Sequence, residues 1–456
     1  MRRLLAPEAL LPEGWCSNVR VEIDSSGRIS DIQPNAEHTS DTERLSGWLL
    51  PGMSNCHSHA WQRALVGLTE GRIPGKDDFW GWREVMYEFL DRIGPEDLQS
   101  IAAQVYLEMI QAGYTSVGEF HYLHHDRRGH PYADPAEMSQ RIIAAAEQAG
   151  IGLTLLPVLY RYGDFGARPP DPGQRRFIHD AESFLTLVER LKSLPNPSLQ
   201  LGIAPHSLRA VDESLLRETL TGAARLLPDA PIHLHIAEQT REVDRCVAAT
   251  GQRPVRWLFE HFDVDGRWCL VHATHMSRAE IETLARSRAV AGVCPTTEAN
   301  LGDGVFPAEA YLALEGQLAV GSDSQMSVDP VAECRLLEYA QRLISQRRGL
   351  LASAAHPNPG DHLFIRACEG GVQALGRAAG RIQVGRQADL IVLDDTDPVL
   401  WGKHPQQRLD SWIFGTQRPV VKDVMVGGQW CIRNTHHPAE EQVRINFQHT
   451  MKKLLI

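Results

Sequence analysis

The sequence is poor in lysine and carries an excess of acidic side chains. Six of its 456 residues are lysine, and 46 basic side chains stand against 57 acidic ones, which gives a formal net charge of −11. An acidic chain repels polyanions, which argues against nucleic acid or an anionic membrane as its main partner. No apolar run approaches the roughly 20 residues needed to span a bilayer. The opening MRRLLAPEALLPEGW is interrupted by proline and glutamate, which makes it a poor signal peptide.

The sequence also lacks paired cysteines. Its eight cysteines show no CxxC and no paired spacing, a pattern typical of reduced thiols in a cytoplasmic protein of this size. Cys56 lies beside two histidines, so a role as a metal ligand is one interpretation of it. Side chains alternate in direction along a strand, however, which points Cys56 away from His57 and favours a buried structural thiol.

The middle of the chain alternates between short apolar runs and helical stretches. Apolar runs typical of strands cover 47–53, 116–120, 152–158, 199–203, 232–236, 268–271, 289–293 and 318–320. Eight strand-helix units predict an α/β fold, a (β/α)8 TIM-like barrel over residues 51–377. The long insert over 61–91 is rich in tryptophan, glycine and charge, and it is a candidate lid.

Both ends of the chain have a different, β-rich character. Short β-like segments separated by turn residues occupy residues 1–50, and similar segments return at 388–394 and 419–426. The two ends therefore predict one small β-sandwich domain beside the barrel, composed of residues 1–50 and 378–456.

Histidine and acidic residues lie at or just past several of the predicted strands. The set comprises His57, His59, His235, Glu238, His272 and Asp323. His57 and His59 are two residues apart, so on an extended segment both face the same side and can bind one ion. Barrel enzymes hold a hydrolytic metal with such residues at the carboxyl ends of their strands.

Several of these residues also have a simpler interpretation. His233 shares an apolar run with His235 and is interpreted as a core or supporting histidine, because His235 lies nearer the end of the run. His275, close to the next run, is equally well a surface residue. The alternative for Asp323 is a cap on the following helix. The alternative for Glu238 is a carboxylate stabilised at a helix N-terminus.

The scarcity of lysine bears on the number of metal ions. Two-metal barrel hydrolases often bridge their ions with a carboxylated lysine from a central strand. No lysine lies between Lys76 and Lys192 or between Lys192 and Lys403, and Lys192 ends a helix-like run. The sequence therefore predicts one divalent metal. Its predicted ligands are His57, His59, His235 and Asp323. Nitrogen and carboxylate donors suit Zn²⁺, with Fe²⁺ as the alternative.

Several segments resemble the amidohydrolase superfamily, and its deaminase branch in particular. They are PGMSNCHSHAWQRA, HIAEQ, LVHATH, GSDS and the tail GRIQVGRQADLIVLDD, so the resemblance runs from about residue 45 to the end. Four further segments resemble the formimidoylglutamate deiminases, which act in histidine degradation. These are GKDDFWGWRE at 75–84, GEFHYLHHD at 118–126, APHSLRAV at 204–211 and CPTTEANLGDGVFP at 294–307.

The resemblance implies a hydrolytic deimination of N-formimino-L-glutamate to N-formyl-L-glutamate and ammonia. In that family the metal lowers the pKa of a bound water into the neutral range, and the resulting hydroxide attacks the formimino carbon. By the same resemblance, Asp323 and His272 accept or hold the proton of that water, and Glu238 carries a proton to the leaving nitrogen.

The resemblance also implies how the pocket holds this substrate, which carries two carboxylates at neutral pH. Arg209 and His206, after the fourth predicted strand, are the candidates for one carboxylate, because a guanidinium binds carboxylate bidentately. Arg83, in the insert, is the candidate for the other end, and an ordinary salt bridge is its alternative. Gln62 and Tyr122 are expected to donate hydrogen bonds to the substrate.

Two other functions are compatible with the same residues. A deaminase of a nucleobase, or of another amidine or guanidine, would use the same site but would favour aromatic stacking over paired arginines. A catalytically inactive scaffold or metal-binding protein is the other alternative, and the complete acid-base set argues against it. Relatives in the resembled family are commonly dimeric, so the resemblance implies a homodimer.

Overall fold

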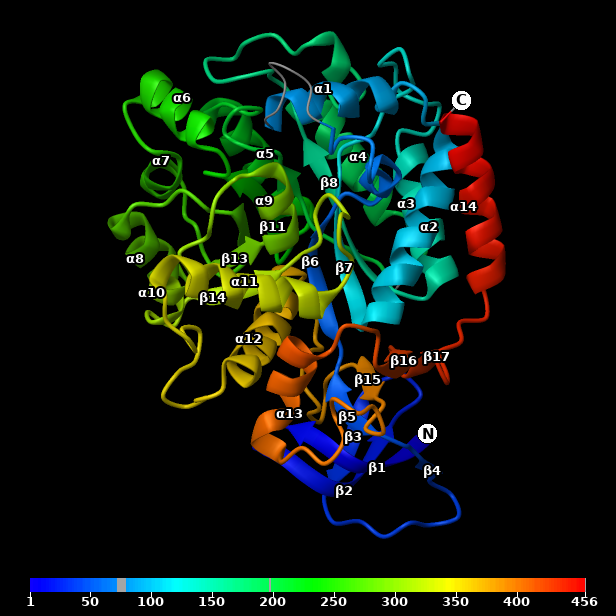
Figure 1. Cartoon of the computed structure of the whole chain (residues 1–456). Coiled ribbons are helices and arrows are strands. Elements are labelled where there is room, and N and C mark those ends of the chain that lie inside the picture. The colour runs from blue at the N-terminus through cyan, green and yellow to red at the C-terminus, as the bar shows by residue number, and fades with distance from the viewer. Residues whose placement is uncertain (72–78, 197, 456) are drawn as a thin grey trace.

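Eight strand positions among the described residues form a ring at the centre of the protein (Figure 1). The structure, a computed structural model, describes residues 1–71, 79–196 and 198–455. The ring consists of β6 (Met53–Ser58), β7 (Tyr114–His121), β8 (Gly152–Leu159), β9 (Gln200–Leu201) with β10 (Ala204–Pro205), β11 (Ile232–Ile236), β12 (Trp268–His272), β13 (Val290–Val293) and β14 (Gln317–Val320).

Neighbouring strands of the ring pair in parallel. One sheet has the order β10-β8-β7-β6, with β9 beside β8, and a second has the order β11-β12-β13-β14. Parallel bridges join the two sheets at both seams: Ser58 pairs with Asp323 between β6 and the end of β14, and Ile203 pairs with Ile232 beside β11. The closed parallel ring confirms the predicted barrel, in which β9 and β10 share the fourth position.

Helices cover the outside of the ring (Figure 1). They are α2 (Pro95–Ala112), α3 (Glu137–Ala149), α4 (Ala181–Lys192), α5 (Glu213–Leu226), α6 (Thr240–Thr250), α7 (Pro254–His261), α8 (Arg278–Ser287), α9 (Pro295–Leu301), α10 (Ala308–Leu312), α11 (Pro330–Ser345) and α12 (Pro359–Ala374). Polar side chains fix where several of them begin. The Asp212 carboxylate accepts the Leu215 amide at 2.8 Å at the start of α5, and Ser277 with Glu280 forms a capping box at α8.

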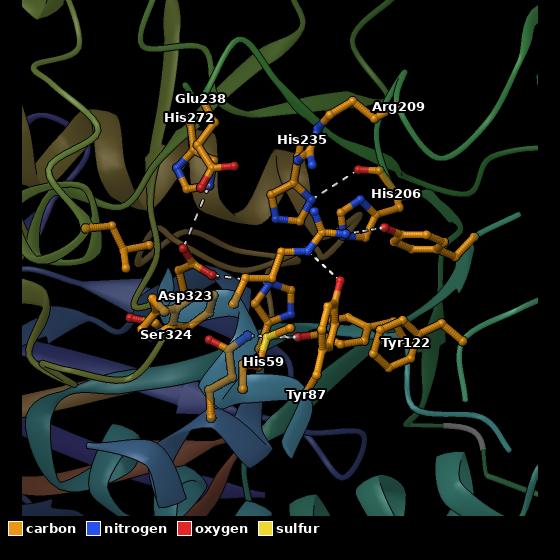
Figure 2. A pocket seen from close by; sticks show the side chains of 17 residues that line it. His59, Tyr87, Tyr122, His206, Arg209, His235, Glu238, His272, Asp323 and Ser324 are labelled. Carbon is orange, nitrogen blue, oxygen red and sulfur yellow. Dashed lines mark hydrogen bonds and ion pairs between the residues drawn. The ribbon is translucent and has the colours of Figure 1, made fainter. Parts of the chain in front are cut away.

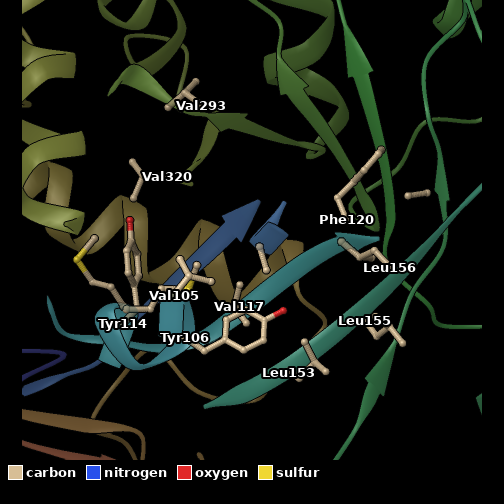
Figure 3. Close-up of a cluster of buried hydrophobic side chains, with 14 of the residues drawn as sticks. Val105, Tyr106, Tyr114, Val117, Phe120, Leu153, Leu155, Leu156, Val293 and Val320 are labelled. Atoms are coloured by element: carbon tan, nitrogen blue, oxygen red, sulfur yellow. The ribbon is translucent and has the colours of Figure 1, made fainter. Parts of the chain in front are cut away.

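The barrel strands are buried on both faces because the helices cover the ring. Every residue of β7 and β8 is buried, as is typical of parallel strands. Figure 3 shows Val105 and Tyr106 of α2 in one cluster with Val117 of β7 and with Leu153 and Leu155 of β8. This packing holds the strands, and with them the loops that follow their carboxyl ends.

Strands from both ends of the chain form a second sheet, below the barrel in Figure 1. Its order is β17-β16-β15-β5-β1-β2-β3, with β4 beside β1. The bounds are β1 (Arg2–Leu11), β2 (Gly14–Ile23), β3 (Ile29–Gln33), β4 (Glu43–Arg44), β5 (Trp48–Pro51), β15 (Leu390–Leu393), β16 (Val421–Val426) and β17 (Gln429–Ile432). The sheet has its own apolar cluster, to which Leu4, Leu49 and Val392 belong. It confirms the small β domain built from both termini.

We propose residues 1–50 with 378–456 as one domain and residues 51–377 as the other. β5 pairs in parallel with β1 and antiparallel with β15, which supports a boundary close to its end. The last helix, α14 (Glu440–Leu454), lies along α2 of the barrel (Figure 1). There the Lys453 ammonium lies 2.8 Å from both carboxylate oxygens of Asp97, so α14 ties the two domains together.

The first predicted strand, over 47–53, is wrong in its extent. It divides into β5, which belongs to the small sheet, and the start of β6, which belongs to the barrel. Gly52 separates them, and a side chain there would meet the Thr115 side chain at 2.1 Å. Glycine therefore lets the chain cross between the sheets close to β7. As a result His57 lies within a strand rather than beyond one.

The insert between β6 and β7 contains η1 (Ala60–Leu65) and α1 (Phe79–Leu90). Residues 72–78 of the predicted lid lie outside the described residues. The remaining described elements are η2 (Pro172–Gln174), η3 (Pro405–Gln407), α13 (Arg408–Asp410) and η4 (Ser411–Gly415). Within the described ranges, no helix is both long and apolar enough to cross a membrane.

Candidate metal and catalytic site

Six polar side chains, from four barrel strands and the segments that follow them, converge at the carboxyl-terminal mouth of the barrel. They are His57 in β6 and His59 directly after it, His235 in β11, Glu238 in the loop after β11, His272 at the end of β12, and Asp323 in the loop after β14. Each is at most 5% exposed. The structure thus brings together the whole set that the sequence singled out.

Four of these side chains place donor atoms around one point and are called here the metal-donor cluster. Ring nitrogens of His57, His59 and His235 and a carboxylate oxygen of Asp323 all lie within 4.8 Å of one another. His57 Nε2 lies 3.2 Å from His59 Nε2, and Asp323 Oδ1 lies 3.5 and 3.2 Å from these two atoms. Three nitrogens and one carboxylate oxygen form a donor set typical of a divalent transition metal.

Hydrogen bonds and burial favour imidazoles that can bind a metal. His59 Nδ1 donates to the Phe120 carbonyl at 3.0 Å, and His235 Nδ1 donates to the His206 carbonyl at 3.1 Å. In each ring Nε2 is left with a lone pair. Burial lowers the pKa of all three cluster histidines, that of His57 to about 3. The neutral imidazole is the form that ligates metal, so these side chains fit a bound ion.

The carboxylate of Asp323 stays ionised in its buried position. Burial raises its pKa, but the neighbouring histidines His57, His59 and His272 outweigh burial and hold the pKa below its ordinary range. Oδ1 faces His57 and His59, whereas Oδ2 lies 3.7 Å from His272 Nε2. One carboxylate therefore contacts both the metal-donor cluster and the histidine beside it.

A polar network beneath the cluster joins the first and last barrel strands. Ser58, the residue between the two β6 histidines, donates to Glu119 at 2.6 Å and accepts from Gln325 Nε2 at 2.9 Å. The same Gln325 amide donates to the Asp323 carbonyl at 2.8 Å. Because the chain segments of β6 and β14 meet here in an isolated bridge, these side chains hold the two histidines in register with Asp323.

The backbone is strained where the strands deliver these side chains. Ala237, His272, Ala273 and Asp323 have φ values of 51°, 67°, 48° and 43°, in the left-handed region that residues other than glycine rarely adopt. Such strain gathers at functional sites. Gly321 precedes Asp323, and a Cβ there would lie 2.9 Å from backbone atoms of the facing β6 histidine. Glycine at this position allows β14 to approach β6.

The structure also bears on the simpler roles considered for several of these side chains, as helix caps, core residues or structural thiols. The cap of α11 is Asp329, not Asp323. Glu238 lies one residue before the N-cap of α6, and its side chain lines the cavity described below. His233 bonds a backbone carbonyl at 2.7 Å inside the barrel core. Cys56 is fully buried among apolar and cysteine side chains, as expected of a structural thiol.

His272 and Glu238 face each other beside the cluster. His272 Nδ1 donates to Glu298 Oε1 at 3.2 Å, and Nε2 lies 3.8 Å from Glu238 Oε1. Burial raises the pKa of Glu238 to about 7. Burial alone would lower the pKa of His272, but Glu238, Glu298 and Asp323 outweigh it and raise the pKa. A carboxyl group that titrates near neutrality can both accept and donate a proton.

A cavity with an empty volume of about 570 Å³ opens beside these groups (Figure 2). The side chains predicted to bind substrate all line it: Gln62, Arg83, Tyr122, His206 and Arg209. Gln62 Nε2 donates to the Tyr122 hydroxyl at 2.8 Å. Arg83 donates to the Tyr160 hydroxyl at 3.0 Å. The cavity thus combines two guanidinium groups with the metal-donor cluster and with the buried imidazole and carboxyl group beside it.

Several cavity residues were not predicted from the sequence. Tyr87, Tyr160 and Phe177 form an aromatic wall, and Gln174 Nε2 donates to the Tyr160 hydroxyl at 2.8 Å. Tyr160 directly follows β8, so a search of strand ends for any polar residue would have found it. Tyr87 comes from α1 in the insert, for which the sequence offers no comparable signal. Glu298 lies within the segment CPTTEANL, where no local pattern distinguishes it; at the site it accepts hydrogen bonds from His272 and from a backbone amide.

Comparison with known proteins agrees with this geometry. The model described as "Amidohydrolase family" matches residues 48–431, and the model described as "Formimidoylglutamate deiminase HutF, N-terminal domain" matches residues 1–46. The chain is 49% identical over 456 residues to a formimidoylglutamate deiminase of Pseudomonas aeruginosa, with 100% of both chains covered. It is 26% identical over 426 residues to a 5-methylthioadenosine/S-adenosylhomocysteine deaminase of Natronomonas pharaonis, with 92% of this chain and 90% of that protein covered.

Solved structures show the same architecture. An amidohydrolase from Brucella melitensis superposes with a TM-score of 0.94 at 44% identity, with 100% of each chain covered. An adenosine deaminase from Xanthomonas campestris with bound zinc shares the fold, with a TM-score of 0.81, 22% identity and 99% and 98% of the chains covered. The family match and the buried His/Asp cluster together support a metal-dependent hydrolase. The chain belongs to the amidohydrolase family, and within it resembles the formimidoylglutamate deiminases over its full length.

Proposed function

We propose that this chain hydrolyses N-formimino-L-glutamate to N-formyl-L-glutamate and ammonia, a step of histidine degradation. The observation that carries the proposal is the full-length identity of 49% to a formimidoylglutamate deiminase, together with the match to the N-terminal domain of such enzymes. The cavity supports the same reaction, because it combines carboxyl and imidazole groups for proton transfer with two guanidinium groups for an anionic substrate.

The proposal includes one divalent metal ion, Zn²⁺ in preference to Fe²⁺. The proposed ligands are His57, His59, His235 and Asp323. When bound, such an ion lowers the pKa of a ligated water toward neutrality and so makes a nucleophile available. The neutral imidazoles and the ionised carboxylate of the metal-donor cluster support this assignment.

Asp323 and His272 are proposed to take the proton of the attacking water. Glu298 fixes His272 Nδ1, which leaves Nε2 to receive or share a proton 3.7 Å from Asp323 Oδ2. The new C–O bond forms at the formimino carbon, and the bond from that carbon to its terminal nitrogen breaks. Glu238 is proposed to carry a proton to this nitrogen, so that it leaves as ammonia. A pKa of about 7 allows Glu238 to take and give protons in one cycle.

Two guanidinium groups in the cavity support a substrate with two carboxylates. Arg209, with His206, is proposed to bind one carboxylate, and Arg83, with Gln62 and Tyr122, is proposed to bind the other. The ring of His206 stacks on the ring of a cluster histidine with a centroid distance of 5.0 Å. A carboxylate held there would lie close to the metal-donor cluster.

Deamination of a ring amidine is the second candidate, because aromatic side chains also line the cavity. They are Trp82, Tyr87, Tyr122, Tyr160 and Phe177. Their faces offer stacking positions for a planar ring, and the relative at 26% identity is a deaminase of 5-methylthioadenosine and S-adenosylhomocysteine. Paired arginines favour the dicarboxylate over an uncharged ring.

An ammonia-release assay with matched substrates separates the two candidates. Zinc-loaded protein is offered N-formimino-L-glutamate, N-formimino-glycine, guanine, cytosine and 5-methylthioadenosine. We expect turnover of N-formimino-L-glutamate and a kcat/KM at least about tenfold lower for N-formimino-glycine, which lacks the second carboxylate and its charge-assisted hydrogen bonds. Preferential turnover of a ring substrate would overturn the proposal in favour of the second candidate.

We also propose that the protein acts in the cytoplasm as a homodimer. All eight cysteines are free thiols, which supports a reducing compartment. Leu343 and Ile344 of α11 are 81% and 66% exposed and offer apolar surface to a second copy of the chain. Light scattering should give twice the chain mass of 50.8 kDa. The mass of one chain at working concentrations would contradict the dimer.

A further inference from the structure

A second group of metal-binding side chains lies directly beside the metal-donor cluster. His272, Cys294 and Asp323 each offer one donor atom within 4.8 Å of the others, and all three are buried. They come from three consecutive barrel strands: His272 ends β12, Cys294 follows β13, and Asp323 follows β14. The scaffold therefore fixes an imidazole, a thiol and a carboxylate next to one another.

We propose that His272, Cys294 and Asp323 form a second, inhibitory site for a thiophilic divalent cation such as Zn²⁺ or Cd²⁺. Imidazole, thiolate and carboxylate are all zinc ligands, and the sulfur sets this site apart from the nitrogen and oxygen donors of the first. Tetrahedral bond lengths separate neighbouring donors by about 3.3–3.8 Å. The three donor atoms lie within 4.8 Å of one another, so to bind one ion each pair must move closer together by at most about 1.5 Å.

The orientation of His272 and Asp323 supports two ions on opposite sides of one carboxylate. His272 Nδ1 is bound to Glu298, while Nε2 is buried and has no hydrogen-bond partner among the described residues. Asp323 Oδ1 faces His57 and His59. Its Oδ2 faces His272 Nε2 at 3.7 Å (Figure 2). Asp323 can thus bridge two ions, with one oxygen for each.

Acidic groups around the site favour a cation there. Glu298 Oε1 accepts from His272 and from the Cys294 backbone amide at 2.8 Å, and Glu238 Oε1 lies 3.8 Å from His272 Nε2, within reach of an ion bound at that nitrogen. A metal binds cysteine as the thiolate and histidine at an unprotonated ring nitrogen, so the cation must displace the protons of the Cys294 thiol and of His272 Nε2. Only metals with a high affinity for sulfur are expected to do so.

A cation bound at this site is expected to stop the deimination proposed above. This expected inhibition rests on the proposed function. A cation on His272 Nε2 takes the place where the proton of the attacking water is to be held. If the same cation also binds the Glu238 carboxylate, Glu238 can no longer protonate the leaving nitrogen. One equivalent of Zn²⁺ should therefore activate the protein, and an excess should inhibit it. Binding at the second site does not depend on which substrate the protein uses.

Cobalt spectroscopy tests the site in the full-length protein. Metal-free protein receives first one and then two equivalents of Co²⁺. The first equivalent is expected to give no thiolate-to-metal charge-transfer band in the near ultraviolet, because the metal-donor cluster contains no sulfur. The second equivalent is expected to give this band. Cys294→Ser and Cys294→Ala should lose it, whereas Cys16→Ser, a control at a half-buried cysteine in β2 of the small sheet, should keep it.

The absence of the band at the second equivalent, or its persistence in both Cys294 variants, would overturn the site. Zinc inhibition supplies an independent readout. The Cys294→Ala variant should keep its activity at one equivalent of Zn²⁺, and its inhibition constant for excess Zn²⁺ should rise about 10–100-fold. Equal inhibition of wild type and variant would refute the site even if the substrate is correct. Lack of turnover by both proteins would instead refute the proposed function, while the cobalt result would stand.

Discussion

Replacement of Glu238 by glutamine tests the acid-base assignment. Glutamine keeps the size and the hydrogen-bonding capacity of the side chain but cannot carry the proton. A positioned general acid-base group contributes about 10²–10⁴-fold to a rate, which corresponds to about 3–5 kcal/mol of activation free energy. We expect kcat of Glu238→Gln to fall by that factor. The metal content should stay at one ion per chain, because Glu238 is not a member of the metal-donor cluster.

The assay measures ammonia release and metal content on the same preparation. Glu280→Gln is the matched control, since Glu280 is 4% exposed and Glu238 is 5% exposed, but Glu280 belongs to the capping box of α8. Its kcat should match that of the wild type. Loss of metal from Glu238→Gln would show that Glu238 is a ligand. A decrease of kcat by less than about tenfold would refute its role in proton transfer.

Arg209, Gln325 and Asp361 offer three further tests. Arg209→Gln removes a guanidinium from the cavity. Because a hydrogen bond to a charged group contributes about 1.5–3 kcal/mol, kcat/KM for N-formimino-L-glutamate should fall about 10–150-fold. Unchanged kinetics would refute carboxylate binding by Arg209. Gln325→Ala removes the amide that donates to Ser58 at 2.9 Å and to the Asp323 carbonyl at 2.8 Å. The free energy of unfolding should therefore fall by about 2–4 kcal/mol. Chelator competition should also show weaker metal binding. Wild-type metal affinity in that variant would refute the positioning role. Burial raises the pKa of Asp361, in the first turn of α12, to about 7. The protonated carboxyl therefore stabilises the native state relative to the ionised one. This stabilisation is complete below about pH 4 and is lost as the pH rises through about 7. Asp361→Asn should therefore gain stability over the wild type at pH 8 but not at pH 4 in urea denaturation, and an equal difference at both pH values would contradict the shift.

The barrel and the metal-donor cluster were predictable because both leave local signals. Strands buried on both faces are continuous apolar runs, and a histidine or carboxylate at the carboxyl end of such a run is favourably placed to project into the mouth of the barrel. The spacing of His57 and His59 places both on one side of an extended segment. Asp323 follows an apolar run and Gly321, and the structure shows that this glycine allows the close approach to β6.

Other features depend on contacts between distant segments, which no local pattern reports. β1 has the sequence RRLLAPEALL, whose Leu, Ala and Glu residues do not favour a strand. Its conformation is decided by pairing with β2 on one side and β5 on the other. The division of 47–53 at Gly52 likewise depends on Thr115, more than sixty residues away in the sequence. Tyr87 lines the cavity because α1 folds against it.

The network beneath the cluster was also beyond sequence reasoning. Ser58, Glu119 and Gln325 are single polar residues within or beside apolar strands, and each would be interpreted alone as a defect of the pattern. Only the closure of the barrel brings them within hydrogen-bond distance. Their role is to hold other side chains, and such roles carry no spacing that a sequence can display.

Turnover of N-formimino-L-glutamate by one preparation, before and after removal of its metal, tests whether the protein is a metal-dependent deiminase. We expect equal amounts of ammonia and N-formyl-L-glutamate from the metal-loaded protein, loss of both on chelation, and recovery with one equivalent of Zn²⁺. No ammonia from the metal-loaded protein, or undiminished turnover by the metal-free protein, would contradict it.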